Sequence, residues 1–478
     1  MSVSKTLLRY GGYVLSVSTA RLVGTLLTAA TFPFLVRRLG VDVYGLWSYI
    51  VAVCGITGLL ANPGLTTYTA QQVAAQREKA FDTVSHTLIL RVMASGLAII
   101  AILIVARFEV RPDVRFLLKW YGVASVLSSS LSLDYLLPSF ELFHVQSFVS
   151  ILQQSLYAVG VFALVRSPQD IFWVPVSILA SSLLTAAIGW IFIWRAGFRF
   201  RLAFSPQRWI SILVPSAHYA GSSLMSTFYH RSGHLAVRWF LGEHALGIYA
   251  AVTRLADVLR NFLSIGQTVL MPRMALHANS PSDLSRLIRV ATSILVLLGV
   301  PLAVGSLVTA PIVVPWLLGS QFQEAVSPFR WVSPYVLAAP AAALFAGTIL
   351  YAMGRHREYL FSTIIGAVGA VILYLLLPPF LGIAGACIAF VLGELLVACS
   401  ALLFCPPEVR RAAFRNWLPA LAVGASLAMA LALHAARVHN LPPLLTVAAG
   451  CSVYFVTCGL LGTTVLKNEF HHILFSPK

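Results

Sequence analysis

Charged residues are scarce in this chain. They make up 10% of its 478 residues, whereas 59% of the residues are hydrophobic. Soluble domains carry about 25% charged residues, and no interval of this sequence is long and polar enough to form one. Apolar segments of about 20 residues recur from end to end instead, and each can cross a bilayer as a helix. The composition predicts an all-α polytopic membrane protein.

Signals for chemistry are absent as well. The chain has no G-x-x-x-x-G-K-[ST] motif for ATP, no Asp-rich motif on a large outer loop and no convincing Ser/His/Asp constellation. Its six cysteines lie almost entirely in apolar segments, without metal-ligand or disulfide spacing. We therefore expect no enzyme activity, no metal site and no cofactor. Movement of a substrate across the membrane is the function that remains.

Acidic residues are half as frequent as basic ones. The chain has 33 Lys and Arg against 16 Asp and Glu, which gives a net charge of +17. The basic residues are scattered through loops, so nucleic acid is not an expected partner. Assigning the loops to alternate sides of the membrane places 19 basic residues on one side and 10 on the other. Because cytoplasmic loops are enriched in Lys and Arg, we predict that both termini face the cytoplasm.

Fourteen apolar segments are candidate membrane spans. The ninth is expected to be the least regular, because Pro301, Pro311 and Pro315 interrupt it. The predicted spans cover residues 11–36, 43–66, 87–106, 114–137, 147–165, 171–194, 210–238, 245–271, 287–318, 326–353, 359–377, 382–404, 416–436 and 441–466.

A nine-residue motif occurs twice, with an offset of 202 residues. Residues 39–47 and 241–249 share the pattern L-G-x-x-x-x-G-[LI]-[WY], and each copy joins the first two spans of its half. The first glycine permits a sharp turn, and the second lets the next helix start close to its neighbour. The offset of six spans makes the halves parallel repeats, which place a substrate between them. Chance similarity of two short turns is the alternative. We predict six-helix bundles over 1–200 and 201–410, and a peripheral pair over 411–478.

The eighth span has a charged face. On a helical wheel, Arg254, Asp257 and Asn261 share one side, with Arg260 at its edge, and the other side is apolar. A charge at membrane depth costs roughly 2.5–3.5 kcal/mol, so this face is expected to meet protein or a water-filled cavity. The alternative is local neutralisation, because Asp257 can reach Arg254 and Arg260 at i−3 and i+3 spacing.

Other spans also contain polar candidates. Arg21 and Thr25 lie on a polar stripe of the first span, and Arg21 has no acidic residue within a turn. A water-filled cavity is the favoured surrounding for Arg21, whereas Thr25 can also bond back to its own helix. Arg231 lies in the seventh span, with a position near the outer surface as its alternative. Glu394, in the twelfth span, can carry a proton or can pack in its protonated form.

Three segments resemble one family of transporters. Phe34–Ile50 resembles the opening of the polysaccharide flippases, which export O-antigen and exopolysaccharide and belong to the multidrug/oligosaccharidyl-lipid/polysaccharide (MOP) superfamily. Gly247–Leu255 resembles their eighth span, and Phe380–Glu394 resembles their twelfth. The resemblance implies fourteen helices in two six-helix bundles, open as a V, plus a peripheral pair. It also implies a substrate made of a short oligosaccharide on a polyprenyl diphosphate, flipped to the outer leaflet for polysaccharide or lipopolysaccharide synthesis.

This resemblance gives the charged residues an expected role. Arginine binds a diphosphate through paired donors. The expected partners are the lipid-linked oligosaccharide, the bilayer of a bacterial or archaeal cytoplasmic membrane, and a polysaccharide polymerase with its chain-length machinery. Asp257 and Glu394 are candidates for coupling to an ion. The candidate substrate-binding residues are Arg21, Arg254, Arg260, Arg231, Asp257, Asn261 and Thr25.

Two other classes of protein remain as alternatives. A drug or cation antiporter of the same superfamily often places an acid in its first or seventh span, and neither span has one in its interior here. A cationic cavity would also repel cationic drugs. A membrane glycosyltransferase or polymerase needs a catalytic outer loop, and the outer loops of this chain are short.

Overall fold

All regular elements in the described part of the chain are helices. The computed structural model describes residues 3–75, 80–195, 197, 204–277, 280–414, 418–439 and 441–474. The chain forms two compact units, Met1–Ala250 and Ala251–Lys478. The grouping into two six-helix bundles and a peripheral pair stays a prediction. The same holds for the orientation of the termini, because residues 1–2 and 475–478 lie outside the described ranges.

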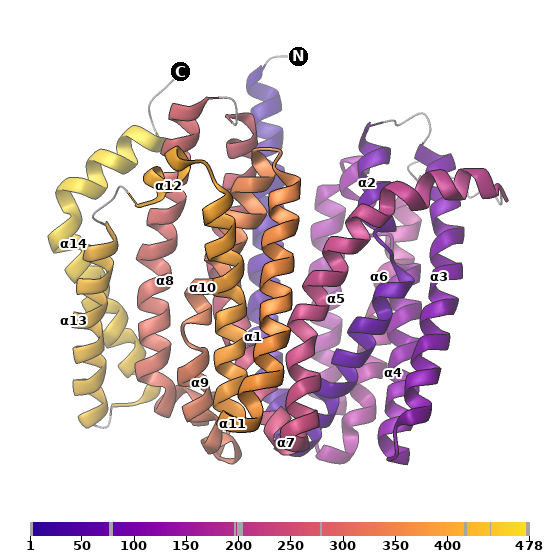
Figure 1. Cartoon of the computed structure of the whole chain (residues 1–478), viewed down its shortest axis with the longest axis horizontal. Coiled ribbons are helices and arrows are strands. Elements are labelled where there is room, and N and C mark those ends of the chain that lie inside the picture. Colours follow the sequence, from indigo (N-terminus) through magenta and orange to yellow (C-terminus); the bar gives the residue numbers. More distant parts are fainter. Residues whose placement is uncertain are drawn as a thin grey trace. The chain divides into compact units, whose positions relative to one another are not determined.

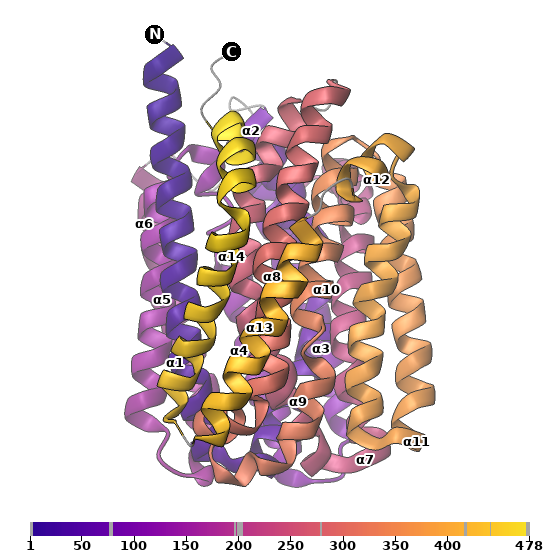
Figure 2. The same cartoon turned by 90° about the vertical axis from the view of Figure 1, so that its left-hand side faces the viewer.

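The first unit contains six helices and the start of a seventh. Figures 1 and 2 show the long helices running side by side. α3 packs on α4, and α5 packs on both α1 and α6. The helices are α1 (Val3–Thr57), α2 (Leu65–Ala75), α3 (Ala80–Phe108), α4 (Pro112–Leu131), α5 (Phe143–Leu164), α6 (Trp173–Arg195) and α7 (Pro206–Leu276). Short 3-10 turns at Gly58–Ala61, Pro138–Phe140 and Pro168–Phe172 lie in the connections.

The second unit continues from α7. α13 packs on α14 and on α8, and α11 packs on α9 and α10. Its helices are α8 (Pro281–Leu318), α9 (Val326–Val332), α10 (Tyr335–Ala342), α11 (His356–Phe404), α12 (Pro407–Phe414), α13 (Leu418–Val438) and α14 (Pro443–Leu474). A 3-10 helix at Ser320–Ala325 precedes α9, and a π-helical stretch at Ala343–Leu350 follows α10.

The predicted spans overlap these helices. In the described residues, eight helices are long and apolar enough to cross a membrane, or nine if the bent pair Ser320–Val332 and Tyr335–Leu350 forms one span. Three long helices each cover two predicted spans and turn at a glycine with positive φ. These glycines are Gly40, Gly242 and Gly382, with φ of 77°, 86° and 60°. The expected irregularity of the ninth span is wrong, because α8 runs as one helix through its three prolines.

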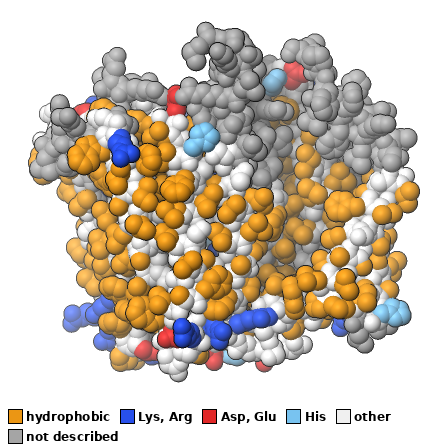
Figure 3. Space-filling view, turned by 180° about the vertical axis from the view of Figure 1, so that it is seen from behind, with side chains coloured by type: hydrophobic (Ala, Val, Ile, Leu, Met, Phe, Trp, Pro, Cys, Tyr) orange, Lys and Arg blue, Asp and Glu red, His pale blue; other side chains and the backbone are white. Residues whose placement is uncertain are grey.

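The surface of the helices has the polarity that a bilayer requires. On α3, Leu97 and Ile100 are more than half exposed, whereas Arg91 and Ser95 are buried. Apolar side chains thus face outward and polar ones face protein, because lipid does not solvate polar groups. Figure 3 shows a broad area of hydrophobic side chains, with Lys and Arg side chains gathered near one edge. The predicted all-α membrane fold is confirmed.

Candidate functional site

The two copies of the repeated motif lie against each other in the first unit. Gly45 and Gly247, the second glycines of the two motifs, are both buried. A Cβ atom on Gly45 would lie 2.8 Å from the Gly247 nitrogen, and a Cβ atom on Gly247 would lie 2.9 Å from the carbonyl carbon of Val41. Only glycine fits at these two positions, because main-chain atoms occupy the space of a side chain. The predicted close approach at the second glycine is confirmed.

The contact between the motifs has local two-fold character. Asp42 and His244 occupy equivalent positions of the repeat, and their Oδ1 and Nδ1 atoms are 2.9 Å apart. A Cβ atom on Gly45 would meet the carbonyl of Glu243, and one on Gly247 would meet the carbonyl of Val41, which is the equivalent residue. Equivalent residues thus contact each other reciprocally. The repeat is a structural feature and not a chance similarity of turns.

A network of ion pairs surrounds this contact. Arg238 of α7 donates two hydrogen bonds to the Glu109 carboxylate, at 3.0 and 3.1 Å, and a third to Glu243 at 3.2 Å. Arg111 donates to Glu243 at 2.6 Å. The Arg238 guanidinium also lies 3.6 Å from the ring centroid of Tyr49 on α1. The network thereby connects α1, the α3–α4 connection and α7.

The pair at the centre of the network is shielded from water. The side chains of Arg238 and Glu109 are 20% and 10% exposed. The hydrogen bonds from Arg238 hold the pKa of the Glu109 carboxyl below its usual value, with burial as the main opposing effect. A bidentate arginine–carboxylate pair of this kind is stronger and more directional than an exposed ion pair.

A second cluster of polar groups lies in the second unit. The Tyr335 hydroxyl donates a hydrogen bond to Asp257 at 2.6 Å, and Asp257 lies 3.7 Å from the Arg260 Nε. Arg260 also donates to Asn261 at 3.3 Å. The Tyr335 ring stacks on Phe390, with 4.2 Å between ring centroids. Asp257 therefore pairs with Arg260, which is one half of the local neutralisation that the sequence left as the alternative.

Two further predicted residues lie in the second unit, in different surroundings. Glu394 is 6% exposed and lies close enough to Tyr335 to act on its hydroxyl electrostatically. It therefore shares a buried region with Tyr335, the donor to Asp257. Arg254 is exposed, although its neighbours Leu255 and Ala256 are buried. The structure thus brings Asp257, Arg260 and Tyr335 together, with Glu394 within electrostatic reach of the Tyr335 hydroxyl, and it leaves Arg254 exposed.

Three predicted residues belong to the first unit. Arg21 is exposed on α1, and the Thr25 hydroxyl donates to the Arg21 carbonyl at 2.9 Å. Thr25 therefore bonds to its own helix, which was the alternative to a role in binding. Arg231 of α7 is half-buried, and a Cβ atom on Gly55 would lie 3.2 Å from its Nε. Arg231 thus packs closely against α1.

Sequence reasoning missed two buried residues. Arg91 lies within α3 and is 2% exposed. Its position inside an apolar segment was the available signal, since such arginines face protein or water. Tyr335 begins the helix after the break at Ser333 and Pro334. No local pattern connects it to Asp257, which is 78 residues away.

Comparisons with known proteins agree with the geometry. The family model described as "Polysaccharide biosynthesis protein" matches residues 13–277. No curated protein gives a match. A structure titled "Lipid II flippase MurJ, inward closed conformation" is 12% identical, with a TM-score of 0.71, and the match covers 95% of this chain and 99% of that one.

Transporters of a second type share the fold. A structure of an inward-facing multidrug resistance MATE family transporter of the MOP superfamily is 16% identical, with a TM-score of 0.65 over 83% of this chain and 98% of that one. An outward-facing structure is 15% identical, with a TM-score of 0.59 over 84% and 95%. At these identities the similarity concerns the fold alone, which is polytopic and helical.

Proposed function

Because this chain belongs to the polysaccharide biosynthesis protein family, we propose that it flips an oligosaccharide linked to polyprenyl diphosphate across the membrane. The direction is from the cytoplasmic to the outer leaflet of a bacterial or archaeal cytoplasmic membrane, with both termini in the cytoplasm. The product then serves polysaccharide synthesis, such as that of O-antigen or exopolysaccharide. A polymerase and its chain-length machinery are the proposed consumers.

The observation that carries this proposal is an accessible arginine on each of two membrane helices. Arg21 on α1 and Arg254 on α7 are exposed, and the helical segments around both are otherwise mainly apolar. Because a charge at membrane depth is costly, such residues favour a water-filled path or a charged substrate. A diphosphate provides the matching negative charge and accepts paired hydrogen bonds from a guanidinium.

The other predicted binding residues have different roles in this proposal. Arg260 donates a hydrogen bond to Asn261 and lies beside Asp257, so in this proposal both side chains are partly engaged within the protein. Arg231 is held against α1 and adds positive charge without facing solvent fully. Thr25 is not assigned to the diphosphate in this proposal, because its only hydroxyl donor is directed to the Arg21 carbonyl.

We propose that the contact between the glycine turns acts as the outer gate. The topology assigned from basic residues places Gly40 and Gly242 on the outer side. Closure there needs the contact of Gly45 with Gly247 and the ion pairs of Arg238. Parallel repeats that separate at one end and approach at the other give alternating access. In this proposal a bound diphosphate neutralises the positive charge of the arginines and thereby favours closure.

The buried cluster of the second unit is the proposed coupling site. Asp257, Tyr335 and Glu394 combine two carboxyl groups with a hydroxyl donor in a largely buried region. Intramembrane carboxyl groups commonly carry protons or bind cations in transporters. No ATP motif is present, so an ion gradient or the membrane potential is the proposed energy source.

Purified protein in liposomes tests the proposed function. A fluorescent polyprenyl-diphosphate oligosaccharide is placed in one leaflet, and its arrival in the other is followed by chemical quenching. Arg254→Ala is expected to slow flipping by about tenfold or more, because hydrogen bonds to charged groups contribute about 1.5–3 kcal/mol. Arg107→Ala, at an exposed arginine at the end of α3, is the matched control and is expected to flip at the wild-type rate.

The antiporter alternative is tested in the same liposomes. Uptake of a cationic dye driven by a proton or sodium gradient, without flipping of the lipid-linked sugar, would refute the flippase proposal. Flipping that is equal in protein-containing and empty liposomes would also refute it.

A further inference from the structure

A polar cavity lies inside the first unit. Its volume is about 390 Å³, within the range of small-molecule sites. It is enclosed by the break after the first long helix and by α2 to α6. Hydroxyl groups dominate its lining. Polar residues around it are Asn62, Thr66, Arg91, Ser125, Ser128, Ser129, Ser132, Asp134, Tyr135, Gln153, Ser182 and Thr185.

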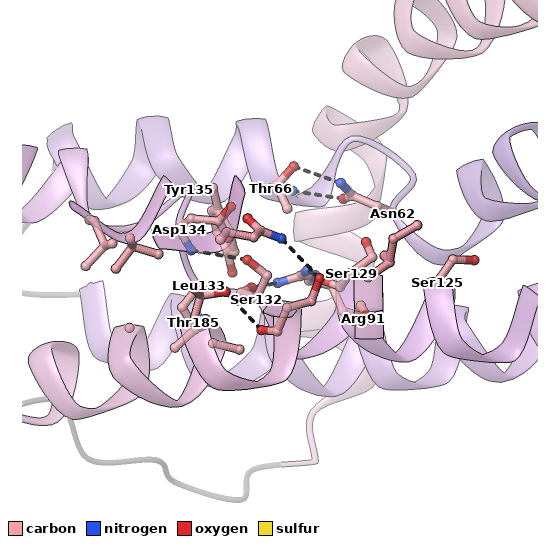
Figure 4. A pocket seen from close by; sticks show the side chains of 18 residues that line it. Asn62, Thr66, Arg91, Ser125, Ser129, Ser132, Leu133, Asp134, Tyr135 and Thr185 are labelled. Atoms are coloured by element: carbon pink, nitrogen blue, oxygen red, sulfur yellow. Dashed lines mark hydrogen bonds between the residues drawn. The ribbon is translucent and has the colours of Figure 1, made fainter. Parts of the chain in front are cut away.

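Arg91 is the buried charge of this cavity. Figure 4 shows its guanidinium among Ser129, Ser132 and Tyr135. It donates to the Ser132 carbonyl at 3.0 Å and to the Ser129 carbonyl, and it lies 5.0 Å from the Tyr135 ring centroid. These two hydrogen bonds use two of its five N–H donors. The Nε atom is buried and has no hydrogen-bond partner.

The charge of Arg91 is only partly compensated. The two carbonyls belong to the C-terminal end of α4, which carries roughly half a negative charge. Within the described residues Arg91 makes no salt bridge, so a positive surplus remains in a buried position. The Tyr135 hydroxyl is buried beside the guanidinium and interacts with it, but its own O–H donates to no acceptor in the described part of the protein. The Arg91 Nε–H and the Tyr135 O–H are thus two donors in one cavity without an acceptor among the described residues, and buried donors are normally satisfied.

Other polar pairs in the cavity are already satisfied. The Asn62 amide bonds to both the hydroxyl and the main-chain nitrogen of Thr66. Gln153 of α5 donates to the Ser182 hydroxyl of α6 at 3.0 Å. Asp134 is the acidic member of the lining and is exposed, so its charge lies toward solvent. The unsatisfied donors therefore concentrate at Arg91 and Tyr135.

We propose that this cavity binds a phosphate group, with Arg91 Nε and the Tyr135 hydroxyl as its donors. A phosphate oxygen accepts several hydrogen bonds and supplies the negative charge that Arg91 lacks, which a neutral sugar or water does not. Ser129 and Ser132 stand beside the guanidinium and add hydroxyl donors. The phosphate belongs to a small soluble ester or to a lipid head group, and this site is separate from Arg21 and Arg254.

Titration of the full-length protein in a maltoside detergent, which contains no phosphate, tests the proposal. Inorganic phosphate is the probe, and calorimetry gives its dissociation constant. Tyr135→Phe removes an O–H group that donates to no acceptor in the described structure and keeps the ring beside Arg91, so folding should be retained while affinity falls at least threefold. Asp134→Asn should raise affinity, because it removes the acid found among the described lining residues. Ser426→Ala, at another buried hydroxyl without a partner, is the control and should leave affinity unchanged.

A second measurement distinguishes whether the bound phosphate group belongs to a lipid head group or to a soluble ester. Native mass spectrometry records retention of added phosphatidylglycerol, phosphatidylcholine and phosphate-free diacylglycerol. Selective retention of the two phospholipids that is lost in Tyr135→Phe identifies a lipid head group, whereas binding of phosphate alone identifies a soluble ester. The proposal is overturned if neither inorganic phosphate nor a phospholipid binds. It is also overturned if Tyr135→Phe and Asp134→Asn bind inorganic phosphate and the phospholipids with the affinity of the wild type.

Discussion

A methyl group at Gly247 is expected to open the contact between the two glycine turns. Its Cβ atom would lie 2.9 Å from the carbonyl carbon of Val41 and 3.0 Å from the Val41 Cγ1 atom. Carbon atoms pack at about 3.5–4.0 Å, and the Val41 carbonyl oxygen lies closer to this Cβ atom than the carbon does, so the turns must separate by more than about 0.6 Å. The clash involves main-chain atoms, which a change of rotamer does not relieve.

The magnitude follows from the cost of overpacking. Inserting a methyl group into a tight contact costs typically about 1–3 kcal/mol. A free energy of about 1.4 kcal/mol changes an equilibrium constant tenfold. The equilibrium constant between closed and open turns therefore shifts by roughly fivefold to more than a hundredfold. Gly45→Ala introduces a methyl group into the same contact from the first motif. The shift in the equilibrium is therefore expected to be little larger in the double variant than in either single variant.

Spin-label distances report this shift. Val110 and Trp239 are 84% and 85% exposed and flank the ion-pair network, so labels there leave the contact intact. Val41 and Ala245 are 7% and 8% exposed, and labels at those positions would themselves disturb the turns. The exposed native cysteines are replaced beforehand.

Gly96→Ala is the matched control for this experiment, because a Cβ atom there meets nothing within 4 Å. It should leave the distance distribution unchanged, whereas Gly247→Ala should move population to longer distances. An unchanged distribution in Gly247→Ala would refute the role of the contact in closure.

Three further perturbations are expected to have defined outcomes. Acid should open the turns: the depressed pKa of Glu109 means that its pair with Arg238 stabilises closure above the ordinary value of 4.5, and this is lost as pH falls through the lower native pKa. The same label distance, compared with Glu109→Gln, measures it. Arg21→Lys should retain partial flipping in the liposome assay and Arg21→Gln should lose roughly tenfold, since charge is required there. Asp257→Asn should make flipping insensitive to imposed proton or sodium gradients while the protein stays in the membrane.

Each of these outcomes has a contrary result. An acid-induced opening of equal size in Glu109→Gln would assign the transition to another group. Wild-type flipping by Arg21→Gln would make the polar stripe of the first span structural. Unchanged dependence on ion gradients in Asp257→Asn would remove the second-unit cluster from coupling.

Local patterns in the sequence predicted the turns well. Gly40 and Gly242 are the first glycines of a repeated motif, and both adopt the positive φ that only glycine reaches without strain. The apolar length of the segments likewise located the helices, because a bilayer fixes how many apolar residues a span needs.

Contacts between distant residues could not be predicted in this way. The pair of Glu109 with Arg238 joins residues 129 positions apart, and Tyr335 reaches Asp257 over 78 positions. Helical periodicity tells which residues share a face, but it does not tell which helix meets that face. Arg91 illustrates the same limit, because its partners are main-chain carbonyls, which every residue has.

The rate of flipping as a function of head-group charge tests the central claim most directly. Liposomes with the wild-type protein and liposomes without protein receive two fluorescent lipids that carry the same oligosaccharide and the same polyprenyl chain. One lipid has a diphosphate linkage, and the other has an uncharged linkage. We expect protein-dependent flipping of the diphosphate lipid and little or none of the uncharged lipid. Equal protein-dependent rates for the two lipids, or no protein-dependent flipping of either, would contradict a flippase that recognises its substrate through arginine.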